Sequence, residues 1–193
     1  MLARVRGRGR THLLAVDDGP FQRGRDAETP LVAVLMEGAD LVEGVAISSF
    51  PVDGEDVTGF LAAFVDGLRF RPSARALVLG GLTLAGLAVV DVRRLAAAIR
   101  LPVVVVNRRQ PQDEPVVAAL RAAGLSERAE LVTGAPASWP AAPGLWAACA
   151  GAEPGVVRAW LERSRRKSAL PEPLRLAHLI AAAVSSGSSR GRA

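Results

Sequence analysis

Short apolar runs alternate with longer amphipathic segments along most of the chain. A short apolar run that stops at turn residues is typical of a strand. Strands are therefore predicted at residues 13–16, 31–36, 41–50, 76–79 and 101–106, with short candidates at 130–133 and 145–150. Turn residues at 37–40 join the second and third runs as a hairpin, whereas the uninterrupted run at 101–106 is typical of a parallel strand buried on both faces.

Helices are predicted where apolar residues recur at i, i+3, i+4 and i+7. Asp56 and Asp91 are suitable N-caps for the first two helices, and Gly124 ends the third. The predicted helices cover residues 57–68, 92–99, 111–123, 154–163 and 171–184, with a Pro/Ala-rich loop before 145. Strands followed by alternating helices predict an α/β fold in which helices cover both faces of a mixed sheet.

One domain at residues 13–184 is expected, between a basic lead at 1–12 and a flexible tail at 185–193. The single cysteine, Cys149, excludes an intramolecular disulfide framework and suits a reducing cytoplasm. The longest uncharged stretch, 76–90, is shorter than a membrane-spanning helix and contains three glycines. The start of the chain lacks the apolar core of a signal peptide. We therefore expect a cytoplasmic protein without a membrane anchor.

Arginine dominates the basic residues, and the formal net charge is +5. The guanidinium fork suits phosphate oxygens, so this surplus favours a nucleic-acid partner. A GC-rich coding bias, which the abundant Ala, Gly and Pro also indicate, explains the same surplus. Arg108 and Arg109 directly follow the run at 101–106 and are candidates for phosphate binding; the alternative is an ordinary solvated face.

Two adjacent carboxylates, Asp17 and Asp18, follow the first predicted strand and precede Gly19 and Pro20. Ligands of open α/β sheets bind at the carboxyl ends of strands, so this pair is placed at the mouth of a site. Side chains alternate along a strand, so one carboxylate can face a cleft while the other faces a helix. The alternative is ordinary turn chemistry, in which Asp bonds the backbone two residues on.

The motifs VDDGPF, VDGEDVT, LVLGGLTLAGLAVVD, LPVVVVNRR and LPEPLRLAHLIAAAV occur in this order over nearly the whole chain. In these motifs the chain resembles the DUF99 or endonuclease dU family (UPF0215-like), which is similar to endonuclease V. The resemblance implies a ribonuclease H-like fold, in which a central first strand lies beside the fourth. It also implies a DNA-repair endonuclease that depends on Mg²⁺ or Mn²⁺ and acts on deaminated (uracil- or inosine-type) DNA.

Carried over to this chain, the resemblance places the catalytic first-strand aspartate at Asp17, with Asp18 beside it as a second metal ligand. Asp53, after the third strand, is a possible supporting carboxylate, although a turn role is equally open, and Asp56 has the alternative role of an N-cap. Thr83, Arg108 and Arg109 are candidates for contacts with phosphate or nucleic acid. The family's fourth-strand motif reads Leu-Asp-Gly, but Gly80 stands at the aspartate position.

Two further hypotheses stand beside the nuclease, and the missing aspartate favours the first of them. The chain could be a catalytically impaired relative that still binds nucleic acid, or an α/β protein whose cleft takes a small phosphorylated ligand. His178 lies on an apolar helix stripe, and we interpret it as a packed histidine with one hydrogen bond. The core is expected to contain Cys149 as an inert thiol and also the three tryptophans, Trp139, Trp146 and Trp160.

Overall fold

The computed structural model describes residues 11–190. The arginines of the basic lead before residue 11, and Arg192 of the tail, lie outside the described residues. The strands of the main sheet are β1 (His12–Asp18), β2 (Glu28–Glu37), β3 (Leu41–Pro51), β4 (Ala76–Leu79), β7 (Val103–Asn107), β8 (Trp139–Ala142) and β9 (Leu145–Ala150). The helices are α1 (Val57–Asp66), α2 (Val92–Ile99), α3 (Asp113–Ala122), α4 (Ser126–Thr133), α5 (Pro154–Arg163) and α6 (Glu172–Ser186), with a short 3₁₀ turn at Arg71–Ser73.

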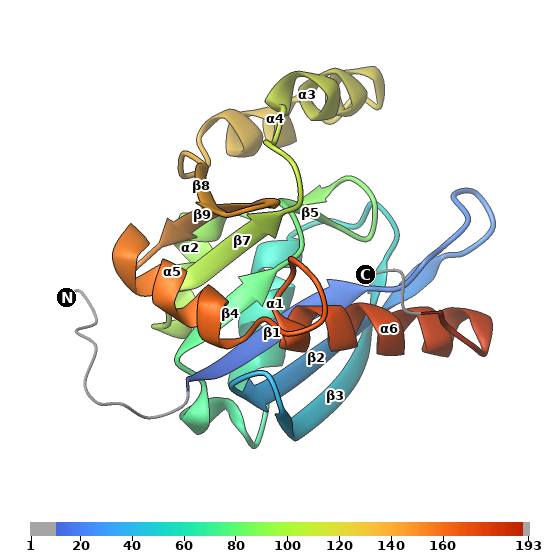
Figure 1. The fold of residues 1–193 in the computed structure, drawn as a ribbon. Helices are drawn as coiled ribbons and strands as arrows, with labels where there is room; N and C mark the ends of the chain where they lie inside the picture. The colour runs from blue at the N-terminus through green and yellow to red at the C-terminus, as the bar shows by residue number, and fades with distance from the viewer. Residues whose placement is uncertain (1–10, 191–193) are drawn as a thin grey trace.

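Within the described residues, the sheet has the strand order β3-β2-β1-β4-β7-β9-β8 (Figure 1). β1 lies at its centre, antiparallel to β2 and parallel to β4. β7 runs parallel to β4, whereas β9 is antiparallel to β7. This topology confirms the predicted mixed sheet with the first strand beside the fourth, and it brings the carboxyl ends of β1, β4 and β7 to one edge.

Alternation along β1 divides the core between the two faces of the sheet. Leu14 and Val16 belong to the apolar cluster that contains Leu61 of α1 and Leu95 of α2. Leu13 and Ala15 belong to the opposite cluster, with residues of α5 and α6. The sheet is therefore enclosed by α1 and α2 on one side and by α5 and α6 on the other (Figure 1).

The helices α3 and α4 pack against each other outside these layers, next to a small hairpin of β5 (Thr83–Leu84) and β6 (Ala88–Val89). The prediction of a strand at residues 130–133 is wrong, because these residues end α4. Ala129 and Val132 are three residues apart on one helical face and pack with Leu120 and Val89. A four-residue window is too short to reveal this helical spacing.

The Pro/Ala-rich segment before residue 145 was predicted as a loop, but it contains strand β8, which pairs with β9. Pro140 is compatible with this position because β8 is an edge strand, where a missing amide N–H is tolerated. The predicted tail also begins too early, since α6 continues to Ser186 and ends at Gly187 with φ 74°. Both N-cap predictions are confirmed: Asp56 accepts from the Gly59 amide and Asp91 from that of Arg94.

Two further expectations concern single side chains. Trp160 is buried, whereas Trp139 and Trp146 are only partly buried, so the core contains one of the three tryptophans fully. Cys149 is partly buried, and burial raises the pKa of its thiol, as expected for an unreactive cysteine.

In the part of the chain that is described, no helix has the length and apolar character needed to cross a membrane.

Candidate functional site

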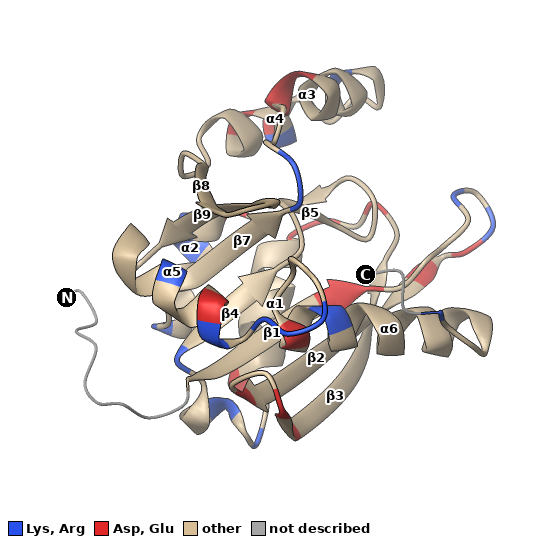
Figure 2. Ribbon diagram, viewed as in Figure 1, with Lys and Arg blue, Asp and Glu red and all other residues tan. Residues whose placement is uncertain are grey.

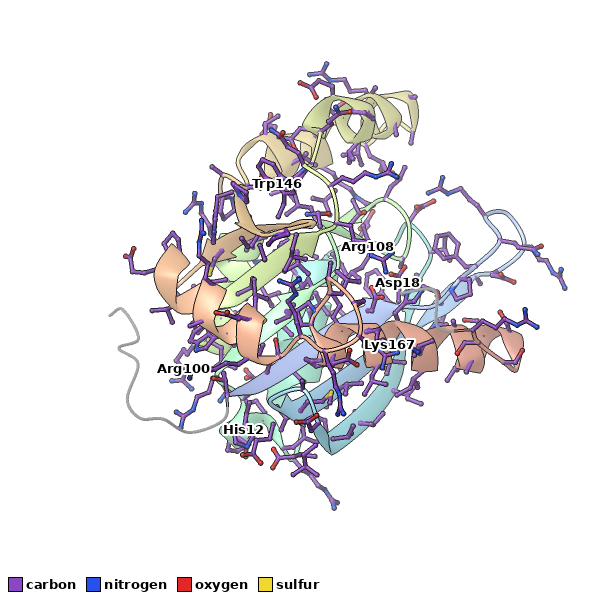
Figure 3. All side chains as sticks on the ribbon, in the orientation of Figure 1. His12, Asp18, Arg100, Arg108, Trp146 and Lys167 are labelled. Carbon is purple, nitrogen blue, oxygen red and sulfur yellow. The ribbon has the colours of Figure 1, made fainter. Side chains whose placement is uncertain are left out.

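A cavity of about 600 Å³ opens at the carboxyl ends of the central strands. Its lining includes Asp17 and Asp18 at the end of β1, Gly80 after β4, and Arg108 after β7; α6 contributes Leu174, His178 and Ala182. Arg108 and Asp18 lie at the same edge of the sheet (Figure 3). In Figure 2 the end of β1 is acidic and the connection from β7 to α3 is basic, so opposite charges meet across this cavity.

Strand register brings Gly80 beside Asp17. Val16 is paired with Leu79 across the parallel β1–β4 ladder, so the next residues, Asp17 and Gly80, follow side by side. A Cβ atom added at Gly80 would lie 3.1 Å from Oδ1 of Asp17 and 3.7 Å from Leu174. The fourth-strand position that lacks an aspartate therefore adjoins the first candidate ligand.

Asp17 points from β1 toward α6, on the same face as Leu13 and Ala15. Its Oδ2 lies 2.9 Å from Nδ1 of His178. This hydrogen bond is the main cause of a raised pKa for the His178 imidazole. The predicted single hydrogen bond of His178 is confirmed, but its side chain is 50% exposed, so the prediction that it is packed is wrong.

Sequence reasoning thus missed a residue of the site. His178 lies on the cavity side of α6 together with Leu174 and Ala182, at i, i+4 and i+8. The available signal was an ionisable residue on an otherwise apolar stripe. Its partner is 161 residues away in the sequence, so only the tertiary fold brings the two side chains together.

Asp18 points to the other face of β1, where its Oδ2 accepts a hydrogen bond of 2.8 Å from the amide of Ala85. Burial, and then repulsion by the Asp17 carboxylate, raise the pKa of Asp18 to about 6. Both causes penalise the ionised carboxylate. A cation bound near these carboxylates would reduce the repulsion.

The other predicted residues, Asp53, Thr83 and Arg109, are not among the described residues that line this cavity. Asp53 forms an ion pair of 2.9 Å with Arg23 and accepts from the Leu87 amide. Thr83 lines a second cavity of about 560 Å³, which shares Gly80 and Asn107 with the first. Arg109 is exposed and is not among the described residues that line either cavity. The structure therefore brings Asp17, Asp18 and Arg108 together.

Asp17 and Asp18 are the carboxylates that line this cavity, so they are the residues that would hold a Mg²⁺ or Mn²⁺ ion, which is commonly bound by one or two carboxylates, waters and substrate phosphates. The residues present do not fit a pair of ions, since Gly80 contributes no side-chain ligand. Among residues 11–190, three close ligand side chains occur at His12, Glu37 and Glu43. Because His12 begins β1 and Asp17 lies near its end, this group is at the opposite edge of the sheet.

Comparisons with known proteins agree with this fold. Residues 9–185 match the family model described as Endonuclease dU. A UPF0215 protein of Methanopyrus kandleri is 36% identical over 183 residues, covering 92% of each chain. A UPF0215 protein of Methanothermobacter thermautotrophicus is 35% identical over 94% of this chain and 91% of the relative.

Solved structures give the same picture. A protein of unknown function from Archaeoglobus fulgidus superposes with a TM-score of 0.82 at 30% identity, covering 90% of this chain and 98% of the other. Endonuclease V of Streptomyces avermitilis gives a TM-score of 0.56 at 18% identity, with 92% and 82% covered.

A Ciona intestinalis endonuclease V, in complex with a 24mer DNA containing an inosine followed by a ribo-adenosine, gives a TM-score of 0.54 at 10% identity, with 87% and 82% covered. At these identities the two endonuclease V structures establish the fold, which is ribonuclease H-like. The family match and the UPF0215 relatives extend over almost the entire chain, and this protein therefore belongs to the endonuclease dU family.

Proposed function

We propose that this protein is a metal-dependent endonuclease of DNA repair that acts on deaminated, uracil- or inosine-type DNA. One observation carries the proposal: Asp17, Asp18, His178 and Arg108, from three separate parts of the chain, line a single cavity at the carboxyl ends of the central strands. Family membership supports nuclease chemistry at this place. The DNA-bound endonuclease V of the same fold supports a nucleic-acid substrate.

In this proposal Asp17 and Asp18 hold one Mg²⁺ or Mn²⁺ ion through their carboxylate oxygens. When bound, such an ion supplies Lewis acidity at a phosphoryl oxygen and lowers the pKa of a coordinated water. The hydrogen bond from His178 fixes the orientation of the Asp17 carboxylate. His178 is half exposed to the cavity, so its other ring nitrogen is available to exchange a proton with water or substrate.

Arg108 is the residue that we assign to the scissile phosphate. It is exposed and lines the cavity. The pKa of His178 is raised, chiefly by the hydrogen bond to Asp17, and the charge of Arg108 opposes this rise in small part. A guanidinium offers two parallel donors to phosphate oxygens, so Arg108 can orient the backbone without taking part in proton transfer. Thr83 lines the adjoining cavity, and we assign it to contacts with the substrate beyond the phosphate.

Cleavage of defined oligonucleotides tests the proposal. Uracil-, inosine- and undamaged DNA are incubated with Mg²⁺, Mn²⁺ or EDTA, beside Asp17→Ala and an exposed control, Glu162→Gln, prepared identically. We expect metal-dependent cutting of the damaged strands by the wild type and the control, and loss of cutting in Asp17→Ala. Equal cutting by Asp17→Ala would contradict the assigned site.

One observation favours a second candidate, a catalytically impaired relative that binds nucleic acid without cutting it. Gly80 leaves the position beside Asp17 without a carboxylate, so a metal ion there has fewer protein ligands than a two-metal nuclease provides. Salt-sensitive DNA binding without cleavage in either metal would favour this candidate. Binding that does not respond to salt would leave a small phosphorylated ligand as the alternative.

A further inference from the structure

Asp53 forms several side-chain bonds after β3, and the sequence left open whether it is a supporting carboxylate or a turn residue. It follows β3 with φ 58°, in the left-handed region. Oδ1 accepts from the Leu87 amide at 2.7 Å and from Nη2 of Arg23 at 2.9 Å. Oδ2 lies 2.9 Å from Nε of the same arginine. Both carboxylate oxygens of Asp53 are therefore engaged by protein groups.

These bonds hold both ends of the turn between β5 and β6. The amide of Asp53 donates to the carbonyl of Ala85 at 2.8 Å, while the side chain of Asp53 accepts from the amide of Leu87. Within this turn, Ala85 has a φ of 47° and Gly86 has a φ of 95°, both positive. A non-glycine residue such as Ala85 occupies this region only where its surroundings fix it.

The conformation of Ala85 matters because its amide donates to Asp18 at 2.8 Å. The peptide groups of Ala85 thus connect Asp53 on one side to Asp18 on the other. Arg128 of α4 links the same two residues, since its Nη1 donates to the carbonyls of both Asp53 and Leu87 at 2.9 and 3.0 Å. The turn is bonded by residues of three segments: Asp53 after β3, Asp18 at the end of β1 and Arg128 of helix α4.

We infer that Asp53 is a positioning residue for Asp18, acting through the Ala85–Leu87 turn, and that it is not a metal ligand. The inference rests on the proposed function for the role of Asp18 in metal binding. The carboxylate of Asp53 fixes the conformation of the turn. The turn directs the Ala85 amide toward Asp18, and that amide orients the Asp18 carboxylate. Groups that orient metal ligands in this way commonly change metal affinity when they are removed.

Two substitutions at Asp53 separate the two roles without adding backbone strain. Asn and Gly both tolerate a positive φ. Asp53→Asn keeps a neutral oxygen that accepts from Leu87, whereas Asp53→Gly removes the acceptor. Glu55→Gln is the matched control, because Glu55 is exposed and lies two residues away.

The first measurement is amide NMR of the metal-free protein, so it does not depend on activity. We expect slow hydrogen exchange and a hydrogen-bonded chemical shift for Ala85 in the wild type, Asp53→Asn and Glu55→Gln. In Asp53→Gly the Ala85 amide should exchange at least about tenfold faster. An unchanged Ala85 amide in Asp53→Gly would overturn the inference, whatever the protein is found to cleave.

The second measurement is the affinity for Mn²⁺ followed by its EPR signal. We expect Asp53→Gly to weaken Mn²⁺ binding by about 10-fold or more, as do substitutions of residues that orient metal ligands. The Mn²⁺ affinity of Asp53→Asn should stay within about 3-fold of the wild-type value. Equal, large losses in both variants would identify Asp53 as a ligand and overturn the inference. If wild type and Asp17→Ala bind Mn²⁺ equally weakly, the proposed metal site fails, while the NMR result still decides the turn.

Discussion

The Nδ1 atom of His178 lies 2.9 Å from Oδ2 of Asp17, joining the last helix to the central strand at the candidate site. The hydrogen bond raises the pKa of His178 above its ordinary 6.5. The protonated imidazole is thus favoured in the folded protein. Its stabilising contribution is fully present below pH 6.5 and is lost as the pH rises through the folded-state pKa.

The first prediction concerns the pH dependence of this pair. Because the imidazole is half exposed, we expect His178→Gln to destabilise the protein by no more than about 1 kcal/mol at pH 5.5, and by less at pH 8.5. Urea unfolding at both pH values, in EDTA, measures the difference. A loss of stability that grows with pH would contradict the predicted sign. NMR titration of His178 in Asp17→Asn should give a pKa lower than in the wild type.

The second prediction concerns Asp18, whose pKa is raised to about 6 from 3.8 by burial and by Asp17. A raised carboxyl pKa lowers the free energy of unfolding once the carboxylate ionises. This penalty is absent below pH 3.8 and complete above about pH 6, with an upper limit on the order of 3 kcal/mol. We expect Asp18→Asn to be more stable than the wild type at pH 8 by part of this amount, with the difference shrinking toward pH 4. Chemical unfolding across this range is the measurement, with Glu162→Gln as an exposed control. Destabilisation at pH 8 would show that the ionised carboxylate contributes more through Ala85 than burial costs.

The third prediction concerns the position beside Asp17. In Gly80→Asp the new Cβ lies 3.1 Å from Asp17 Oδ1, so a small adjustment is needed and the new carboxylate is adjacent to the first. We expect tighter Mn²⁺ binding by about 10-fold or more and, if the wild type cleaves weakly, faster cleavage. Gly80→Ala adds the Cβ without the carboxylate and should gain neither. Cleavage in Gly80→Asp alone would mean that the natural protein is an impaired relative. Unchanged Mn²⁺ affinity in Gly80→Asp would contradict the placement of the metal beside Asp17.

The fourth prediction concerns the contact between the loop after β1 and helix α6. A Cβ at Gly19 would collide with Ser185 Oγ and would lie 2.8 Å from both the Ala181 carbonyl and Pro30 Cγ. We expect Gly19→Ala to destabilise the protein by roughly 1–3 kcal/mol, as overpacking does, and to shift the NMR signals of His178 on the same helix. Gly155→Ala is the matched control: nothing lies within 4 Å of its Cβ, and Ala in a helix is favoured over Gly by about 0.5–1 kcal/mol. Thermal unfolding of both variants measures the contrast, and equal stabilities would contradict it.

The fifth prediction concerns phosphate contact by Arg108. Each neutralised phosphate contributes roughly −0.9 to the log–log salt dependence of duplex DNA binding. Arg108→Gln should make this slope less negative by about one phosphate and weaken binding to damaged and undamaged DNA alike. Arg93→Gln removes the same charge from an exposed position on α2 and should leave the slope unchanged. Equal slopes in Arg108→Gln and the wild type would remove Arg108 from the proposed interface.

Local patterns predicted most of the fold. The apolar runs that became β1, β2, β4, β7 and β9 stand out because burial on a sheet face requires them, whereas the apolar run of β3 was recognisable although its large apolar side chains are mostly exposed. Asp56 and Asp91 were recognisable because an N-cap needs a short polar side chain. Errors occurred where the signal was short or ambiguous. The end of α4 was predicted as a strand, and the edge strand β8 was not predicted because it contains Pro140.

For the site, the sequence by itself determined that Asp17 and Asp18 stand at the end of an apolar strand, since both the strand and its end are local features. Only the tertiary structure decided what each carboxylate meets. Asp17 meets His178 across 161 residues, and Asp18 meets Ala85 across 67. Such pairings follow from strand register and helix packing, which are set by the whole core at once and leave no periodic trace near either residue.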